Sequence, residues 1–436
     1  MGTELPQRPT PRRSPFAATV PSVVASLGFA VATVVWVVAG ADLPGGRWLA
    51  VHLFTLGVLT NLVWAFSRHF AQRLTTLPER DRLRLPLVLL LNVGVVVTLV
   101  GVAGGHVVAV GAGSTAVTGV VLAGWWHLRR RRAAAPEARF AWVVRIYERA
   151  HGAFVHGAVL GALLGVGVLP GSWFLSARDA HLHVMVLGWG GLTLVATLVF
   201  FGPALLRTRM EAGADERAAG ALRRAATALT VAVVAMLLTG VGGTAATVLS
   251  LAAAAGLVVV LVGVLAVTGP VLRAAAAAKP YLARGPVMGV AVWLPVAVAI
   301  DVVAVAAGQR SWLEAAGVVL LVGALGQAVL VVLVFITPTL RGATFAARER
   351  WLARTSRLAG PRTFVLNVGV ALVGIATALG TTAGPGGTVV VRAGWSAVAL
   401  GVAAHLLVVL WPVRDAGLDT SRAVADRRGR RSGQGS

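Results

Sequence analysis

Two hydrophobic stretches far apart in the chain each begin with a histidine that is followed five residues later by glycine. His52 precedes Gly57, His183 precedes Gly188, and His181 lies two residues before His183. An unpartnered imidazole in hydrocarbon costs several kcal/mol, so a histidine there needs a partner. Neutral imidazole is a preferred ligand of iron and of other transition metals. These histidines are therefore the leading candidates for binding a metal or a haem iron.

His181 and His183 point to nearly opposite faces if their stretch is helical, because successive helical residues are about 100° apart. One helix then presents one imidazole to each of two sites. His52 occupies the place in its stretch that His183 occupies in the other. We therefore predict that His52 and one of the two later histidines hold one haem from opposite sides. The alternative is that each histidine only hydrogen-bonds a carbonyl or a lipid headgroup.

Five further residues are weaker candidates. His106 lies at a depth similar to that of His52, where it is a candidate metal ligand or a helix cap. His156 and His405 lie inside apolar stretches and are candidates for a proton path or a second site. Asp301 is the only carboxylate deep in such a stretch, where an acid is a functional candidate by default. Arg178 is a candidate for binding haem propionates, with an ordinary ion pair to its neighbour as the alternative.

The composition is that of a polytopic integral membrane protein. Of the 436 residues, 57% are hydrophobic and 13% are charged, and the mean hydropathy is +0.82, whereas soluble domains are about 25% charged. The chain has no cysteine, which excludes disulfides, cysteine-ligated iron–sulfur clusters and c-type haem attachment. The formal charge of +23 favours membrane lipid rather than nucleic acid as the partner, because the arginines lie between hydrophobic stretches.

We predict an all-α protein with twelve spans, each of about 20 residues, the length that crosses about 30 Å of hydrocarbon. The predicted spans are residues 19–41, 47–67, 84–104, 106–127, 150–170, 181–203, 221–242, 246–269, 286–308, 312–338, 363–383 and 390–412.

Every second connection between these spans is rich in arginine, and the others are short and nearly uncharged. The positive-inside rule then places both termini in the cytoplasm. The expected location is the cytoplasmic membrane of a bacterium. No cleavable signal peptide is expected, because the first apolar run is long enough to span. Residues 1–18 and 414–436 are rich in Arg, Pro, Gly and Ser and are expected to be disordered cytoplasmic tails. The single membrane domain is expected to cover residues 19–413.

Similar short sequences recur in the same order along the chain. Leu91-Asn92-Val93-Gly94-Val95 has a counterpart in Leu366-Asn367-Val368-Gly369-Val370, and Gly57 has counterparts in Gly188 and Gly323. The period of roughly 135 residues predicts three copies of a four-helix unit. The units are expected near residues 19–127, 150–269 and 286–413. Chance similarity among helices rich in Val, Leu and Gly is the alternative.

This arrangement resembles subunit I of the haem–copper oxidases, whose superfamily includes nitric oxide reductases and the more distant NnrS-like membrane haem proteins. The run Ala180-His181-Leu182-His183-Val184 resembles the family's Ala-His-x-His motif, whose histidines ligate two different haems. His52 matches the low-spin haem ligand on the family's second helix. The stretch is also similar to a membrane region associated with actinobacterial copper nitrite reductase-type proteins.

The resemblance implies three pseudo-symmetric four-helix arcs, one or two haems b, and His52, His181 and His183 as iron ligands. Copper, with His106 as a further candidate ligand, is a second expectation. The family's copper site also needs a His-x-x-x-Tyr run and a His-His pair, and this sequence has neither near the predicted sixth and seventh spans. The usual oxygen-reducing centre is therefore not expected.

The leading hypothesis is a b-type haem protein that transfers electrons or handles a nitrogen oxide or another small gas. Whether it is an enzyme is left open; the resemblance implies a redox partner of the cupredoxin or quinol type. A secondary transporter is the first alternative, and Pro295 near Asp301 favours it because broken helices carry transporter sites. A copper- or haem-handling accessory protein is the second.

Overall fold

The computed structural model describes residues 16–39, 43–77, 82–279, 283–340, 345–380 and 385–410. In these ranges the regular structure is helical, without strands. Eleven helices of the described chain are long and apolar enough to cross a membrane, which confirms an all-α, multi-pass protein. They cover Ala17–Ala39, Gly46–Thr75, Arg84–Ala103, Val107–Ala134, Gly171–Leu206, Ala214–Val241, Gly243–Ala277, Arg284–Ala307, Arg310–Pro338, Ala359–Ala378 and Gly387–Val409.

The remaining predicted span, residues 150–170, corresponds to α6, Ala141–Val166. This helix is not among the eleven. Its first half carries Arg145, Glu148 and Arg149, which leaves 17 uncharged residues up to its end at Val166. The helix ends at Val166 because Gly167 takes up a left-handed conformation with φ of 74°. A twelve-span arrangement stays a prediction. The predicted tails lie almost entirely outside the described residues.

Three of the long helices contain a π-helical segment. Each segment begins directly after His52 or after one of the residues that correspond to it in the repeat, His183 and Val318. The first is η2, Leu53–Leu59, after His52; the second is η3, Val184–Gly191, after His183; the third is η5, Val319–Gly326, after Val318. They join α2 (Gly46–His52) to α3 (Thr60–Thr75), α7 (Gly171–His183) to α8 (Leu192–Leu206), and α12 (Arg310–Val318) to α13 (Gln327–Leu340). Such segments are rare and are frequent at functional sites.

The fifth residue of each π-helix is a glycine that allows a neighbouring helix to approach. Gly57 lies against Phe29 of α1 (Val20–Ala39), Gly188 against Ala153 of α6, and Gly323 against Trp293 of α11 (Arg284–Ala307). A Cβ atom would lie 2.5, 2.9 and 2.8 Å from these side chains, respectively. The same contact, between a π-helix and the helix that precedes it, thus occurs three times.

Side-chain amides join neighbouring helices at two corresponding places. Asn61 donates to Asn92 Oδ1 at 2.9 Å, and Gln327 donates to Asn367 Oδ1 at 2.7 Å. Asn61 and Gln327 each stand eight residues after the start of their π-helix. At the corresponding position after η3 stands Leu192. The amides hold helices together, as expected for polar side chains between membrane helices.

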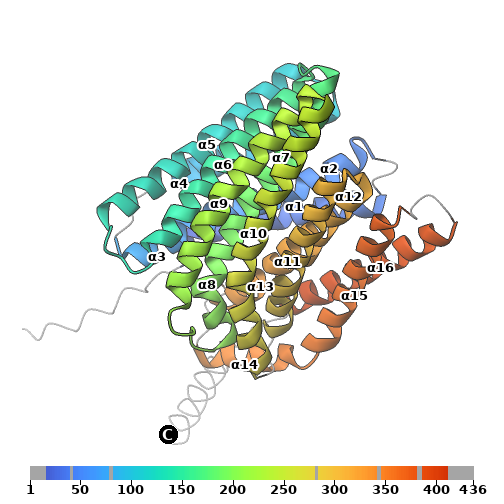
Figure 1. Ribbon diagram of the computed structural model, residues 1–436. Coiled ribbons are helices and arrows are strands. Elements are labelled where there is room, and N and C mark those ends of the chain that lie inside the picture. Colours follow the sequence, from blue (N-terminus) through green and yellow to red (C-terminus); the bar gives the residue numbers. More distant parts are fainter. Residues whose placement is uncertain are drawn as a thin grey trace, which may run out of the picture.

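Three pairs of consecutive helices form closely packed hairpins: α4 (Arg84–Ala103) with α5 (Val107–Ala134), α9 (Ala214–Leu238) with α10 (Gly243–Ala277), and α15 (Ala359–Ala378) with α16 (Pro385–Leu410). In Figure 1 the chain crosses the bundle from the teal α4–α6 through the green α9–α10 to the red α15–α16.

One of these hairpins offers a stability test. A Cβ at Gly113 of α5 would lie 2.6 Å from the Thr98 backbone nitrogen and 2.7 Å from the Gly94 carbonyl oxygen. We expect Gly113→Ala to lower the free energy of unfolding by about 1–3 kcal/mol, since the helices must separate. Gly119→Ala on the same helix is the control, because a Cβ there meets nothing within 4 Å. Thermal unfolding in detergent compares the two variants, and equal midpoints would contradict the packing.

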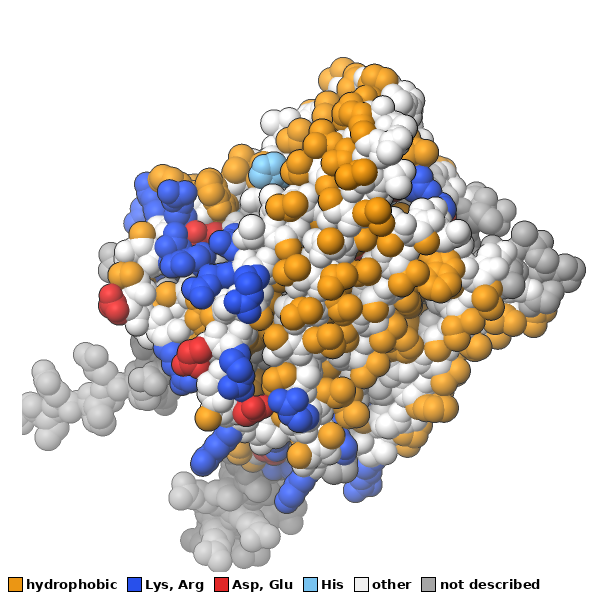
Figure 2. Space-filling view, viewed as in Figure 1, with side chains coloured by type: hydrophobic (Ala, Val, Ile, Leu, Met, Phe, Trp, Pro, Cys, Tyr) orange, Lys and Arg blue, Asp and Glu red, His pale blue; other side chains and the backbone are white. Residues whose placement is uncertain are grey.

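Charge is distributed unevenly over the surface. Figure 2 shows most of the visible Lys and Arg along the left and lower edges and a few at the upper right, whereas apolar side chains cover the middle. The lower edge lies near α8 and α14 (Phe345–Ser356) of Figure 1. The arginine-rich connections therefore lie at one side of an apolar band, as the positive-inside pattern requires.

Candidate functional site

The imidazoles of His52 and His181, each on a different long helix, face each other. Their ring centroids are 6.4 Å apart and their planes are inclined by 13°. This separation exceeds the roughly 3.5–4 Å of van der Waals contact between carbon atoms, so the rings do not stack directly on each other. Both side chains are half-buried. Of the two later histidines, the structure brings His181 to His52.

Backbone carbonyls hold both rings in one tautomer. His52 Nδ1 donates to the Trp48 carbonyl oxygen at 2.8 Å, and His181 Nδ1 donates to the Gly157 carbonyl oxygen at 2.7 Å. Because a carbonyl oxygen only accepts, each Nδ1 carries the proton and each Nε2 keeps its lone pair. Metal-binding histidines commonly have this arrangement, in which the second nitrogen donates to a carbonyl and fixes the ring.

Small and aromatic residues on neighbouring turns position the two rings. The indole of Trp48 stacks on His52 with centroids 4.0 Å apart. On α6, a Cβ at Gly161 would lie 2.7 Å from His181 Cε1, so only glycine leaves room for this imidazole. Gly157 likewise has no room for a side chain, because Met185 packs over it. The spacing of these two α6 glycines, four residues apart, is typical of close helix contacts in membranes. This spacing is the feature of the sequence that indicates a close approach of α6 to a neighbouring helix.

His183 is placed differently from the sequence prediction. Its Nε2 lies 3.0 Å from Asp301 Oδ1, and its Nδ1 donates to the Asp179 carbonyl oxygen at 2.7 Å. His183 is 1% exposed and Asp301 is 5% exposed. Both ring nitrogens are therefore engaged, and the buried pair of His183 with Asp301 joins α7 to α11. A metal-binding role for His183 would require Asp301 to release Nε2.

A second ionic contact joins the same region to α12. Arg310 Nη1 donates to both oxygens of Asp179, at 2.8 and 3.1 Å. Arg178, the candidate for propionate binding, lies 3.6 Å from the Asp179 carboxylate and its side chain is 45% exposed. The ion pair with its neighbour that was the alternative is thus present, on α7 rather than in a loop.

The other candidate residues lie apart from His52 and His181. His106 is exposed and lies directly before Val107, the first residue of α5. His156 is exposed on α6, with Nδ1 bonded to the Gly152 carbonyl oxygen at 2.8 Å. His405 is buried in α16, and its Nδ1 donates to the Gly401 carbonyl oxygen at 2.8 Å. Among the described residues, no three His, Asp or Glu side chains gather as a metal site would require.

One buried histidine lies outside the set of candidate site residues. His151 on α6 is fully buried, and its ring meets that of Trp189 at 4.7 Å between centroids, edge to face. His151 Nε2 and Trp189 Nε1 are both buried without a hydrogen-bond partner among the described residues. Nothing in the sequence indicated that these rings meet, since they lie on separate helices.

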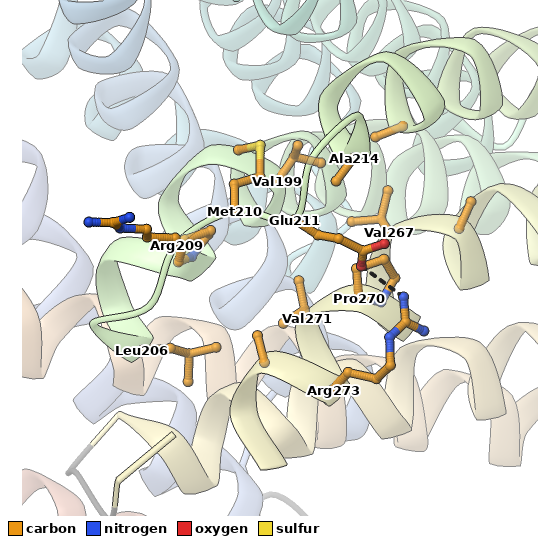
Figure 3. Close-up of a pocket in the computed structure, with 14 residues that line it drawn as sticks. Val199, Leu206, Arg209, Met210, Glu211, Ala214, Val267, Pro270, Val271 and Arg273 are labelled. Atoms are coloured by element: carbon orange, nitrogen blue, oxygen red, sulfur yellow. Dashed lines mark hydrogen bonds and ion pairs between the residues drawn. The ribbon is translucent and has the colours of Figure 1, made fainter. Parts of the chain in front are cut away.

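A cavity of about 240 Å³ lies elsewhere, at the arginine-rich ends of α8, α9 and α10. Figure 3 shows Val199, Val267 and Val271 beside an ion pair between Glu211 and Arg273, whose atoms are 3.0 Å apart. The hydrogen bond from Arg273 lowers the pKa of the exposed Glu211 carboxyl. None of the candidate histidines lines this cavity.

No family model matches this chain, and no curated protein is significantly similar to it in sequence. The site must therefore be interpreted from its own geometry.

Proposed function

We propose that the chain is a multi-pass membrane haem protein in which His52 and His181 bind one b-type haem, and that it transfers electrons. The observation that carries this proposal is the pair of facing imidazoles, each with Nδ1 bonded to a carbonyl. Two neighbouring imidazoles on helices 129 residues apart in sequence suit a shared ligand better than two unrelated hydrogen bonds.

The donor set and its spacing fit an iron held between two imidazoles. Metal–imidazole bonds are about 2 Å long, so the two bonded nitrogens would be about 4 Å apart if the imidazoles bound a metal from opposite sides. The ring centroids lie behind these nitrogens and are therefore farther apart, which agrees with the observed 6.4 Å. The absence of cysteine from the sequence is compatible with haem held only by its axial ligands.

The chain's own residues orient this site. The carbonyl of Gly157 and the carbonyl of Trp48 fix the two tautomers, and glycine at 161 keeps α6 clear of the His181 ring. Arg178, half-exposed beside the pair, is placed to meet a carboxylate such as a haem propionate. A haem with two imidazole ligands supplies one-electron chemistry, and its iron has no open position for a substrate.

The recurrent contacts support a relationship to oxidase subunit I. Three π-helices, three glycine contacts and two amide pairs recur at corresponding places, as three pseudo-symmetric four-helix units would require. We propose twelve spans with both termini in the cytoplasm of a bacterium, so that His52 and His181 lie near the outer face. A cupredoxin-type protein or a quinol is then the redox partner that reaches them. The engagement of His183 with Asp301 favours one haem over two, and disfavours copper at His183.

A secondary transporter is the second candidate, and the His183–Asp301 pair is the observation that favours it. Buried ionisable residues inside membrane helices are often part of a substrate or ion path. This pair lies beside a π-helix, and Pro295 lies within α11, the helix of Asp301. A copper- or haem-handling accessory role would use the same histidines without electron transfer.

Haem titration tests the proposal. The purified, haem-depleted protein is titrated with haem in detergent, and the bound fraction is read from the visible absorbance. We expect saturation at one haem per chain. Failure to bind haem, together with substrate uptake by the protein in proteoliposomes, would replace the haem protein with the transporter.

Gly161 gives a positioning test of the same proposal. A methyl group there would lie 2.7 Å from His181 Cε1 and would push the imidazole from its place. We expect Gly161→Ala to weaken haem binding about 10–100-fold, as when outer-shell support of a metal ligand is lost. Gly152→Ala, on the same helix with nothing within 4 Å of its Cβ, is the control. Equal affinities of the two variants would contradict the assigned role of His181.

A further inference from the structure

A shallow depression of about 490 Å³ lies between α6, α9 and α10, well away from the histidine pair. Three of its six lining residues are arginines, Arg149, Arg223 and Arg224; Thr227, Ala228 and Val259 complete it. The arginines come from two helices and are brought together by the packing of α6 against α9.

The positive charge of this depression is not neutralised within the described chain. The adjacent Glu148 pairs instead with Arg132, at 2.5 and 3.1 Å, and Asp215 pairs with Arg139 at 2.9 Å. No ion pair with a carboxylate joins any of the three arginines within the described residues. Three neighbouring guanidinium groups without a counter-charge repel one another and favour binding of an anion.

The guanidinium of Arg149 is held beside α9. Its Nη1 donates to the Arg223 carbonyl oxygen at 3.1 Å, and Thr227 Oγ1 donates to the same oxygen at 3.1 Å. All three arginine side chains are exposed, so their remaining N–H groups face outward. The planar fork of a guanidinium binds phosphate oxygens in a bidentate manner.

The arginines lie at the depth of a lipid headgroup. Arg149 stands 17 residues before Val166, the end of α6, and Arg224 stands 17 residues before Val241. At 1.5 Å per residue, both distances are about 26 Å, which is close to the hydrocarbon thickness of about 30 Å. The two helices therefore present their arginines at one boundary of the apolar band. The apolar surface continues from there toward the arginine-poor ends with the exposed Val231, Val234 and Val248.

We propose that Arg149, Arg223 and Arg224 form a binding site for the headgroup phosphate of an anionic phospholipid in the arginine-rich leaflet. The phosphate meets the three guanidinium groups, and an acyl chain lies along the exposed valines of α9 and α10. Basic pockets between membrane helices on the cytoplasmic side bind anionic lipid headgroups in this way. The continuous apolar surface favours a phospholipid over free phosphate.

The test compares two double variants of the full-length protein, each of which replaces two consecutive arginines. Arg223→Ala/Arg224→Ala removes two charges from the depression, and Arg129→Ala/Arg130→Ala removes two exposed arginines of α5 that instead contact Trp125 and Trp126. Binding of phosphatidylglycerol to delipidated protein in neutral detergent is measured by native mass spectrometry. At roughly a fivefold contribution per basic residue, we expect the first variant to bind about 25-fold more weakly. The Arg129/Arg130 variant should bind as the unaltered protein does.

Three further measurements distinguish the outcomes. Phosphatidylcholine should not compete for the site, because its headgroup has no net charge, and inorganic phosphate should not displace phosphatidylglycerol at equal concentration. Displacement by inorganic phosphate would overturn the lipid assignment, and equal weakening in both double variants would overturn the site. Arg223→Lys/Arg224→Lys keeps the charge and serves if the alanine variant does not fold; it should bind more weakly than the unaltered protein, because ammonium groups lack the bidentate fork.

Discussion

His181→Ala and His52→Ala are each expected to abolish haem binding. Each change removes one of two facing imidazoles, and the remaining ring cannot hold the iron from both sides. Haem content per purified chain is measured from the visible absorbance and from the extracted haem. The effect should be as large for either variant, because each ring would supply one of the two bonds to the iron.

His156→Ala is the matched control for these variants. His156 has the same type of bond from Nδ1 to a carbonyl oxygen, but it is exposed on the outside of α6. Its removal should leave the haem content unchanged. If His156→Ala lost as much haem as His181→Ala, the facing pair would have no special role, and the account would fail.

Asp301→Ala is expected to destabilise the protein without removing haem. His183 would keep its bond to the Asp179 carbonyl, but its Nε2 would be left buried and unpartnered. Breaking one side of a buried pair costs about 3–5 kcal/mol. Unfolding in mixed detergent micelles measures this loss. Haem content of the folded fraction is measured in parallel.

A double replacement separates the pair's structural role from a role in binding the metal. His183→Leu/Asp301→Leu removes both polar groups, and apolar replacement of a buried pair is often close to neutral. We therefore expect the double variant to recover most of the stability lost in Asp301→Ala, and to retain its haem. Loss of haem in the double variant would show that His183, rather than His181, is the ligand on α7.

The span pattern could be predicted from sequence because apolar length and arginine position are local properties. Eleven predicted spans correspond to long apolar helices. The span predicted at residues 150–170 corresponds to α6, which begins earlier, at Ala141. The first half of α6 contains charged residues, so apolar length alone does not predict where the helix begins. Asn92 and Asn367, which correspond in the repeat, each bond to an amide on the preceding membrane helix.

The candidate site could be predicted only in part, because rotation and tilt of helices are set by tertiary packing. The sequence indicated that His181 and His183 point to different faces, but not which one faces His52. Asp301 decides this, because its carboxylate bonds to His183 Nε2. Asp301 lies on a helix more than one hundred residues later in the sequence. The π-helices also alter the rotation of the residues that follow them, and no propensity rule predicted those segments. His151 and Trp189 meet for the same tertiary reason.

The most direct measurement of the central claim is the optical spectrum of the purified protein, oxidised and then reduced with dithionite, before and after addition of carbon monoxide. With both axial positions taken by His52 and His181, the account predicts a sharp α-band on reduction and no spectral change with carbon monoxide. A colourless protein after expression in a haem-replete host would contradict haem binding. A large spectral shift with carbon monoxide would contradict the pairing of the two histidines on one iron.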